Sequence, residues 1–145
     1  LYRTAIETGL RASELESLRR SDLHLDARRP YVTCAADETK NGKSARQYVT
    51  AALAEELRAF LASHPDRRRV FQTGNLTNLP RVLRKDLAEA RARWIAAANN
   101  DEQEAEGRRR SDFLEAVDRD GRTLDFHALR HTCGAWLAMR GVHPK

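Results

Sequence analysis

The stretch Asp125-Phe126-His127-Ala128-Leu129-Arg130-His131-Thr132 lies near the C-terminal end of this 145-residue chain. Asp125 is a residue type that caps helix starts and Gly141 one that ends helices, so the sequence predicts a helix over residues 125–140. His127 and Arg130 are three positions apart and share one face of that helix. An imidazole can move a proton near neutral pH, and a guanidinium can hold a phosphate through two parallel hydrogen bonds. This pairing suits phosphoryl transfer on a nucleic acid, although an ordinary polar helix face would show the same spacing.

Other helices are indicated by apolar residues at helical spacing and by capping residues or proline at the segment starts. The upstream helices are expected at residues 1–7, 13–19, 51–63 and 80–98. Two β-prone runs, at residues 30–35 and 46–50, flank Asn41-Gly42, the strongest short-range hairpin signal. A shorter extended segment at residues 23–25 precedes them. The sequence therefore predicts a mainly helical α+β fold with a small antiparallel sheet of about three strands.

One segment lacks the apolar residues that would fix it in a core. Residues 99–110 are polar and rich in Glu and Arg, and Asp120-Gly121 marks a turn farther on. We expect residues 99–123 to be an exposed insertion or loop within one domain that covers residues 1–145.

The composition permits an anionic partner. Lys and Arg, mostly Arg, number 26 against 21 Asp and Glu, which gives a net charge of +5 on a surface of mixed sign. Cys34 and Cys133 have no partner at Cys-x-x-Cys spacing, so we expect buried, reduced thiols in a cytosolic protein. No apolar run approaches the length of a membrane span, so no membrane partner is expected.

Two further motifs precede the His-x-x-Arg stretch: Thr8-Gly9-Leu10-Arg11-Ala12-Ser13-Glu14-Leu15 and Glu38-Thr39-Lys40-Asn41-Gly42-Lys43. In this order, the three motifs resemble the catalytic domain of the tyrosine recombinases, the phage integrase family, over nearly the whole chain. The resemblance implies a tyrosine-recombinase catalytic-core fold and site-specific recombination or integration of mobile DNA. In that family, double-stranded DNA is cut and rejoined through a 3′-phosphotyrosyl intermediate, without metal or cofactor.

The resemblance also implies roles for individual residues. Arg11 and Arg130 match the arginines that stabilise negative charge on the scissile phosphate. Lys40 matches the lysine that protonates the departing 5′-oxygen, with Lys43 as a rival for that role. His127 matches the histidine that hydrogen-bonds the phosphate and assists proton transfer.

Two more residues of these motifs have supporting roles by resemblance. Glu14 matches an acidic residue that orients the active site, which here would hold the Arg11 guanidinium. His131 is expected to be a structural, hydrogen-bonded residue. His127 and His131 have the spacing of a zinc-ligand pair, but no third ligand is evident, so no metal site is expected.

The family pattern continues with a Gly-His (or Trp) element and then the tyrosine nucleophile, and residues 1–145 match neither. Tyr2, Tyr31 and Tyr48 all precede the His-x-x-Arg helix, and none is assigned as the nucleophile. We therefore expect a partial catalytic domain that binds DNA without cleaving it by itself. Full-length family members act as homotetramers on two duplexes.

Two alternatives stay open at this point. One is a non-catalytic DNA-binding module that keeps the basic surface but lacks the chemistry. The other, a type IB topoisomerase relative, would use similar Arg, Lys and His machinery, but the compact motifs around Arg11 and Arg130 favour the integrases.

Overall fold

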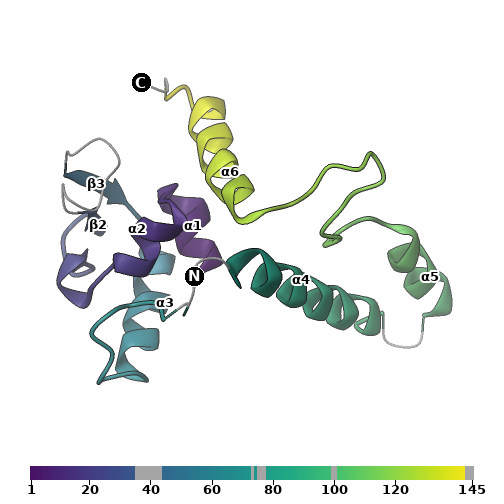
Figure 1. Cartoon of the computed structure of the whole chain (residues 1–145), viewed down its shortest axis with the longest axis horizontal. Helices are drawn as coiled ribbons and strands as arrows, with labels where there is room; N and C mark the ends of the chain where they lie inside the picture. The colour runs from purple at the N-terminus through teal and green to yellow at the C-terminus, as the bar shows by residue number, and fades with distance from the viewer. Residues whose placement is uncertain (35–43, 73, 75–77, 99–100, 143–145) are drawn as a thin grey trace. The chain divides into compact units, whose positions relative to one another are not determined.

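The computed structural model describes residues 1–34, 44–72, 74, 78–98 and 101–142 (Figure 1). The chain forms two compact units, of which the first comprises Leu1–Leu76 with His127–Lys145 and the second Thr77–Phe126. Helices predominate, and the strands form one small antiparallel sheet. The predicted mainly helical α+β fold is confirmed.

The sheet of the first unit has three strands in the order β1 (Leu23–His24), β2 (Tyr31–Cys34), β3 (Ala45–Tyr48). Both strand pairs are antiparallel, as the sequence predicted. Along β2, Val32 and Cys34 are buried and the alternate residues are half-buried, so one face of the sheet packs on the core. The predicted hairpin turn with Lys40 lies outside the described residues.

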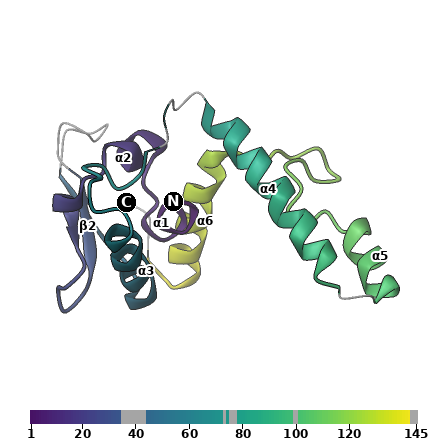
Figure 2. The ribbon, with the colours of Figure 1, turned by 90° about the horizontal axis from the view of Figure 1, so that it is seen from below.

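The helices of the first unit are α1 (Tyr2–Thr8), α2 (Ala12–Ser17), α3 (Ala51–Ala62) and α6 (Phe126–Met139), with a 3-10 turn η1 (Arg20–Asp22). Their inward-facing residues form the core together with the sheet. Its most deeply buried large side chains are Leu15, Leu18, Val32, Val70 and Thr4. Figures 1 and 2 show α1 between α3 and α6.

The start of α2 differs from the predicted one. A helix was predicted over residues 13–19, which opens at Ser13, a capping residue type, but the N-cap of α2 is Arg11, two residues earlier. The Glu14 carboxylate accepts a hydrogen bond from the Arg11 backbone N–H at 2.7 Å, as the acidic residue of a capping box does. The hydrogen bond from the Arg11 N–H to the Glu14 carboxylate therefore determines where the helix starts.

Gly9 shapes the junction between α1 and α6. It ends α1 in the left-handed conformation, with φ 64°, and its N–H donates to the Ala5 carbonyl at 2.9 Å. A Cβ atom at this position would lie 3.1 Å from Cys133 Sγ on α6. A glycine is thus required here both by the backbone conformation and by the close approach of a neighbouring helix.

The second unit consists of α4 (Leu79–Ala96), α5 (Glu102–Arg110) and a following segment with an isolated bridge between Val117 and Thr123. The predicted helix at residues 80–98 is confirmed as α4. Within the expected exposed insertion or loop at residues 99–123, the described part contains a helix, α5, which the sequence analysis did not predict. Polarity alone indicated exposure, and most of α5 is indeed exposed.

Charge placement explains why so polar a segment is helical. Asp101 caps α5 by accepting from the Glu104 N–H at 2.9 Å, acidic residues fill the first turn, and three arginines fill the last turn. The pair Arg110–Glu106 is four positions apart with N···O 2.9 Å. Hydrogen bonds from Arg110 and then Arg109 hold the pKa of Glu106 below its ordinary value.

Arg91 on α4 holds the segment that follows α5. Its guanidinium donates to the backbone carbonyls of Phe113 at 2.6 Å, Ser111 at 2.7 Å and Arg109 at 2.9 Å. It also pairs with Glu115 at 3.0 Å, and its side chain is only 13% exposed. One arginine side chain thus satisfies a carbonyl in the last turn of α5 and two carbonyls of the irregular segment that follows it.

Replacement of Gly9 tests the α1–α6 junction. Gly9→Ala is expected to lower the free energy of unfolding by about 1–2 kcal/mol, because a side chain is strained at this φ and crowds Cys133. Gly134→Ala is the control, since a Cβ there in the interior of α6 meets nothing within 4 Å. It should raise stability by up to about 1 kcal/mol. Urea unfolding measures both, and a stabilising Gly9→Ala would contradict the account.

Replacement of Arg91 tests the second unit. Arg91→Ala is expected to cost about 2 kcal/mol, because several partly buried hydrogen bonds to a charged group are lost. The matched control is Arg93→Ala on the same helix, whose side chain is 78% exposed and pairs only across one turn with Glu89. That change should stay within about 0.5 kcal/mol. Hydrogen exchange of the α4 and α5 amides provides the measurement, and equal effects of the two variants would refute the role of Arg91.

Candidate functional site

Arg11 stands at the N-terminus of α2 with an acidic partner one turn ahead. Its guanidinium donates to Glu14 Oε1 at 2.9 Å, while its backbone N–H donates to the other oxygen of the same carboxylate. The Glu14 side chain is 5% exposed and that of Arg11 36%. A buried carboxylate therefore fixes a guanidinium that solvent can still reach, and a planar fork with five N–H donors retains several for a ligand.

Arg130 reaches the same stretch of chain from α6. Its guanidinium donates to the backbone carbonyl of Gly9. Gly9 is two residues before Arg11, and two residues of chain span at most about 7 Å. The Arg130 guanidinium thus contacts the short segment between α1 and α2 that ends at Arg11, although the two arginines are 119 positions apart in sequence (130 minus 11).

His127 and His131 lie on the exposed side of α6. Their rings contact each other edge-on, with centroids 4.7 Å apart and planes at 90°. His127 precedes Arg130 by one helical turn, as the sequence predicted. A solvent-accessible imidazole next to Arg130 along the helix can accept or donate a proton at a bound anion.

Lys40 and its rival Lys43 lie outside the described residues. In the part of the chain that the structure describes, no group of three or more His, Cys, Asp or Glu side chains could hold a metal ion.

Cys133 contributes to the packing of α6 on α1, although the sequence predicted only that it is a buried thiol. Its Sγ lies 3.6 Å from the Glu7 carbonyl oxygen, to which the thiol donates, and it packs against Gly9. Burial raises the pKa of the thiol, and the positive charge of Arg130 opposes that shift. Arg130 and Cys133 are three positions apart, so both contacts lock the same face of α6 onto the end of α1. Gly9 of the Thr-Gly-Leu-Arg motif indicates from sequence that another part of the chain could approach closely there. The sequence does not show that this part is Cys133.

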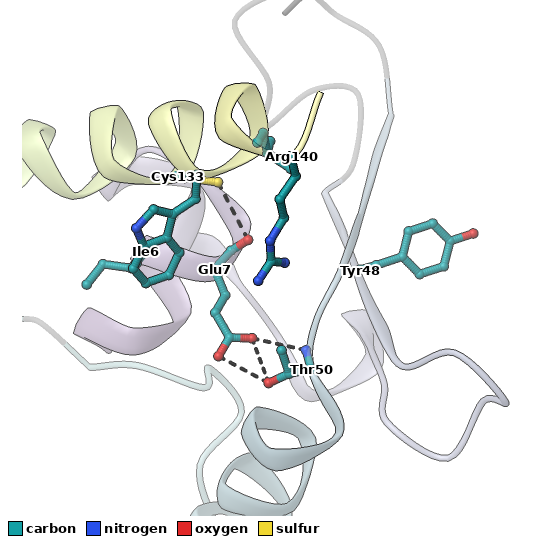
Figure 3. Close-up of a pocket in the computed structure, with 8 residues that line it drawn as sticks. Ile6, Glu7, Tyr48, Thr50, Cys133 and Arg140 are labelled. Carbon is teal, nitrogen blue, oxygen red and sulfur yellow. Dashed lines mark hydrogen bonds between the residues drawn. The ribbon is translucent and has the colours of Figure 1, made fainter. Parts of the chain in front are cut away.

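A pocket of about 200 Å³ lies beside this junction (Figure 3). It is lined by Ile6, Glu7, Tyr48, Thr50, Cys133, Trp136, Leu137 and Arg140. The Glu7 carboxylate accepts from the Thr50 N–H at 3.0 Å and from Thr50 Oγ1, which ties α1 to the start of α3. The Arg140 side chain extends toward Glu7. The candidate catalytic residues that the structure describes, Arg11, His127 and Arg130, do not line this pocket, so we do not assign it to the phosphate chemistry.

The comparisons with known proteins concern the chain as a whole. The model of the phage integrase family matches residues 1–145. No curated protein and no solved structure matches the chain. None of the described helices combines the length and the apolar character that crossing a membrane requires. With the family match extending over every residue of the sequence, the chain belongs to the phage integrase family.

Proposed function

We propose that the chain is part of the catalytic core of a site-specific DNA recombinase, in which Arg11 and Arg130 together hold the scissile phosphate. The observation that carries this proposal is the hydrogen bond from the Arg130 guanidinium to the Gly9 carbonyl. It supports a site in which both guanidinium groups border one short segment. Residues 1–145 would then form one partial catalytic domain, with residues 99–123 as a polar insertion in it.

The two arginines suit the charge that develops during phosphoryl transfer. Negative charge accumulates on the non-bridging oxygens, and donors already fixed in place stabilise it without reorganisation. Arg11 is fixed by Glu14 and Arg130 by the Gly9 carbonyl. Lysine could supply the charge at either position, but not the planar fork that makes two parallel hydrogen bonds.

The remaining chemistry is assigned by the family resemblance. A tyrosine hydroxyl attacks phosphorus, the bond from phosphorus to the 5′-oxygen breaks, and a 3′-phosphotyrosyl link forms. His127 would hydrogen-bond the phosphate and assist removal of the tyrosine proton. Lys40, with Lys43 as its rival, would give a proton to the 5′-oxygen. Glu14 and His131 would support the site without touching the substrate, and no metal or cofactor takes part.

The partner in this proposal is double-stranded DNA, on which the full-length protein would act as a homotetramer. A net charge of +5 with an excess of arginine is compatible with phosphate contacts along a duplex. The non-catalytic DNA-binding module predicts the same charge, so the two hypotheses differ in whether Arg11 and Arg130 act together on one phosphate.

Duplex binding by Arg130 variants tests the phosphate site. Arg130→Ala should weaken duplex affinity about tenfold or more, since a charge-assisted contact is lost, and lower the salt slope by about one. Arg130→Lys should keep the slope and recover only part of the affinity. Fluorescence anisotropy at several salt concentrations measures both quantities.

The control for this test is Arg110→Ala, which removes one arginine from α5, where its side chain is 78% exposed and paired with Glu106. It should leave duplex affinity within about twofold. If Arg110→Ala and Arg130→Ala weaken binding equally, the affinity comes from diffuse charge and the phosphate site is wrong.

A separate experiment tests the assignment of the nucleophile. Residues 1–145 contain no tyrosine that we assign to attack, so incubation with a nicked suicide duplex should give no covalent adduct on a denaturing gel. The contrary result would be an adduct that disappears in Tyr2→Phe, Tyr31→Phe or Tyr48→Phe, and it would identify a nucleophile that we have excluded.

A further inference from the structure

The face of the sheet turned away from the core carries aromatic and basic side chains. Val32 and Cys34, at 0% and 2% exposure, occupy the core side of β2, which leaves Tyr31 and Thr33 on the other side. The strand register places Tyr48 opposite Tyr31. Cross-strand partners share a face, so this face is not part of the core.

Four residues of this face form a continuous layer, which we call the sheet platform: His24, Tyr31, Arg46 and Tyr48. The rings of His24 and Tyr31 are stacked, with centroids 4.4 Å apart and planes at 17°. The Arg46 guanidinium carbon lies 4.3 Å from the centroid of the Tyr31 ring. Tyr48 meets Tyr31 edge-on at 6.1 Å. The platform thus combines flat rings with a permanent positive charge.

Tyr48 is the open end of the platform. It is 56% exposed, although large aromatic side chains are usually well covered. Its ring projects away from Glu7 and Thr50 of the adjoining pocket (Figure 3). Arg46 lies two positions away on the same face of β3, about 7 Å along the strand. An aromatic ring and a guanidinium are therefore presented side by side to solvent.

The charge around the platform favours an anionic partner. Arg28 and Arg29 are exposed in the turn between β1 and β2. The acidic residue of that turn, Asp26, is paired with Arg58 at 3.0 Å. Basic residues thus outnumber acidic ones in this turn, which suits a polyanionic partner.

We propose that the sheet platform binds single-stranded DNA, with a base stacked on Tyr48 and an adjacent phosphate held by Arg46. Proteins that bind single strands without sequence preference pair aromatic rings, on which any base can stack, with cations that follow the backbone. The inference rests on the proposed function in one respect, because breaking and exchanging strands of a duplex exposes unpaired nucleotides. The platform residues are separate from Arg11 and Arg130.

The test compares two substitutions of Tyr48, whose exposure allows both without loss of the core. Tyr48→Ala removes the ring and should weaken binding of a labelled oligothymidine of about a dozen nucleotides roughly tenfold. Tyr48→Phe keeps the ring and should retain the affinity. Both variants should bind a duplex of mixed sequence as the parent chain does. Anisotropy titrations at one low salt concentration give all four values, and circular dichroism verifies folding.

Arg130→Ala is the reciprocal variant, expected to weaken duplex binding while leaving oligothymidine binding unchanged. If Tyr48→Ala leaves oligothymidine affinity unchanged, or lowers duplex affinity by the same factor, the platform is not a single-strand site. If Tyr48→Ala weakens only oligothymidine binding but Arg130→Ala leaves duplex binding unchanged, the single-strand site is supported and the proposed phosphate site is refuted.

Discussion

The hydrogen bond from Arg130 to the Gly9 carbonyl joins two segments separated by 121 positions of sequence. A carbonyl at the end of a helix has no partner within that helix and carries part of the negative end of the helix dipole. A guanidinium supplies both a hydrogen-bond donor for that carbonyl and a positive charge next to the negative end of the dipole. The contact also requires that α6 approach closely, and the absence of a side chain at Gly9, with φ 64°, favours that approach. Placement of a functional cation and packing of α6 on α1 therefore depend on the same few atoms.

The arginines of this chain have several different roles, so their number alone says little about DNA binding. Arg20 donates to the carbonyls of Leu61, His64 and Pro65 at the end of α3, and Arg91 donates to three carbonyls at and just after the end of α5. These guanidinium groups substitute for regular secondary structure by satisfying backbone acceptors. Arg11 and Arg130 differ from these two in that each is held by a buried partner, Glu14 or Gly9, in one of the family motifs.

Much of the fold was predictable because its signals are local. Thr50 caps α3, Pro80 stands in the first turn of α4, and β2 alternates buried with half-buried residues. The prediction from sequence was wrong at the start of α2, where Ser13 is a capping residue type but Glu14 forms the capping box with Arg11. It also missed α5, a helix that charge rather than apolar spacing stabilises. The spacing of His127 and Arg130 was evident from sequence. The contact of Cys133 with Gly9 was not, since it depends on how distant helices pack. The catalytic roles of Arg11, Lys40, His127 and Arg130 stay predictions.

The pairing of Arg11 with a buried carboxylate affects the kinetics of DNA association. Seen from beyond a Debye length, Arg11 and Glu14 nearly cancel, so this arginine adds little to the field that draws a polyanion toward the protein. Its directional N–H groups act only once a phosphate is within hydrogen-bonding range. Arg11 should therefore govern how long a complex lasts, while unpaired surface cations govern how often one forms.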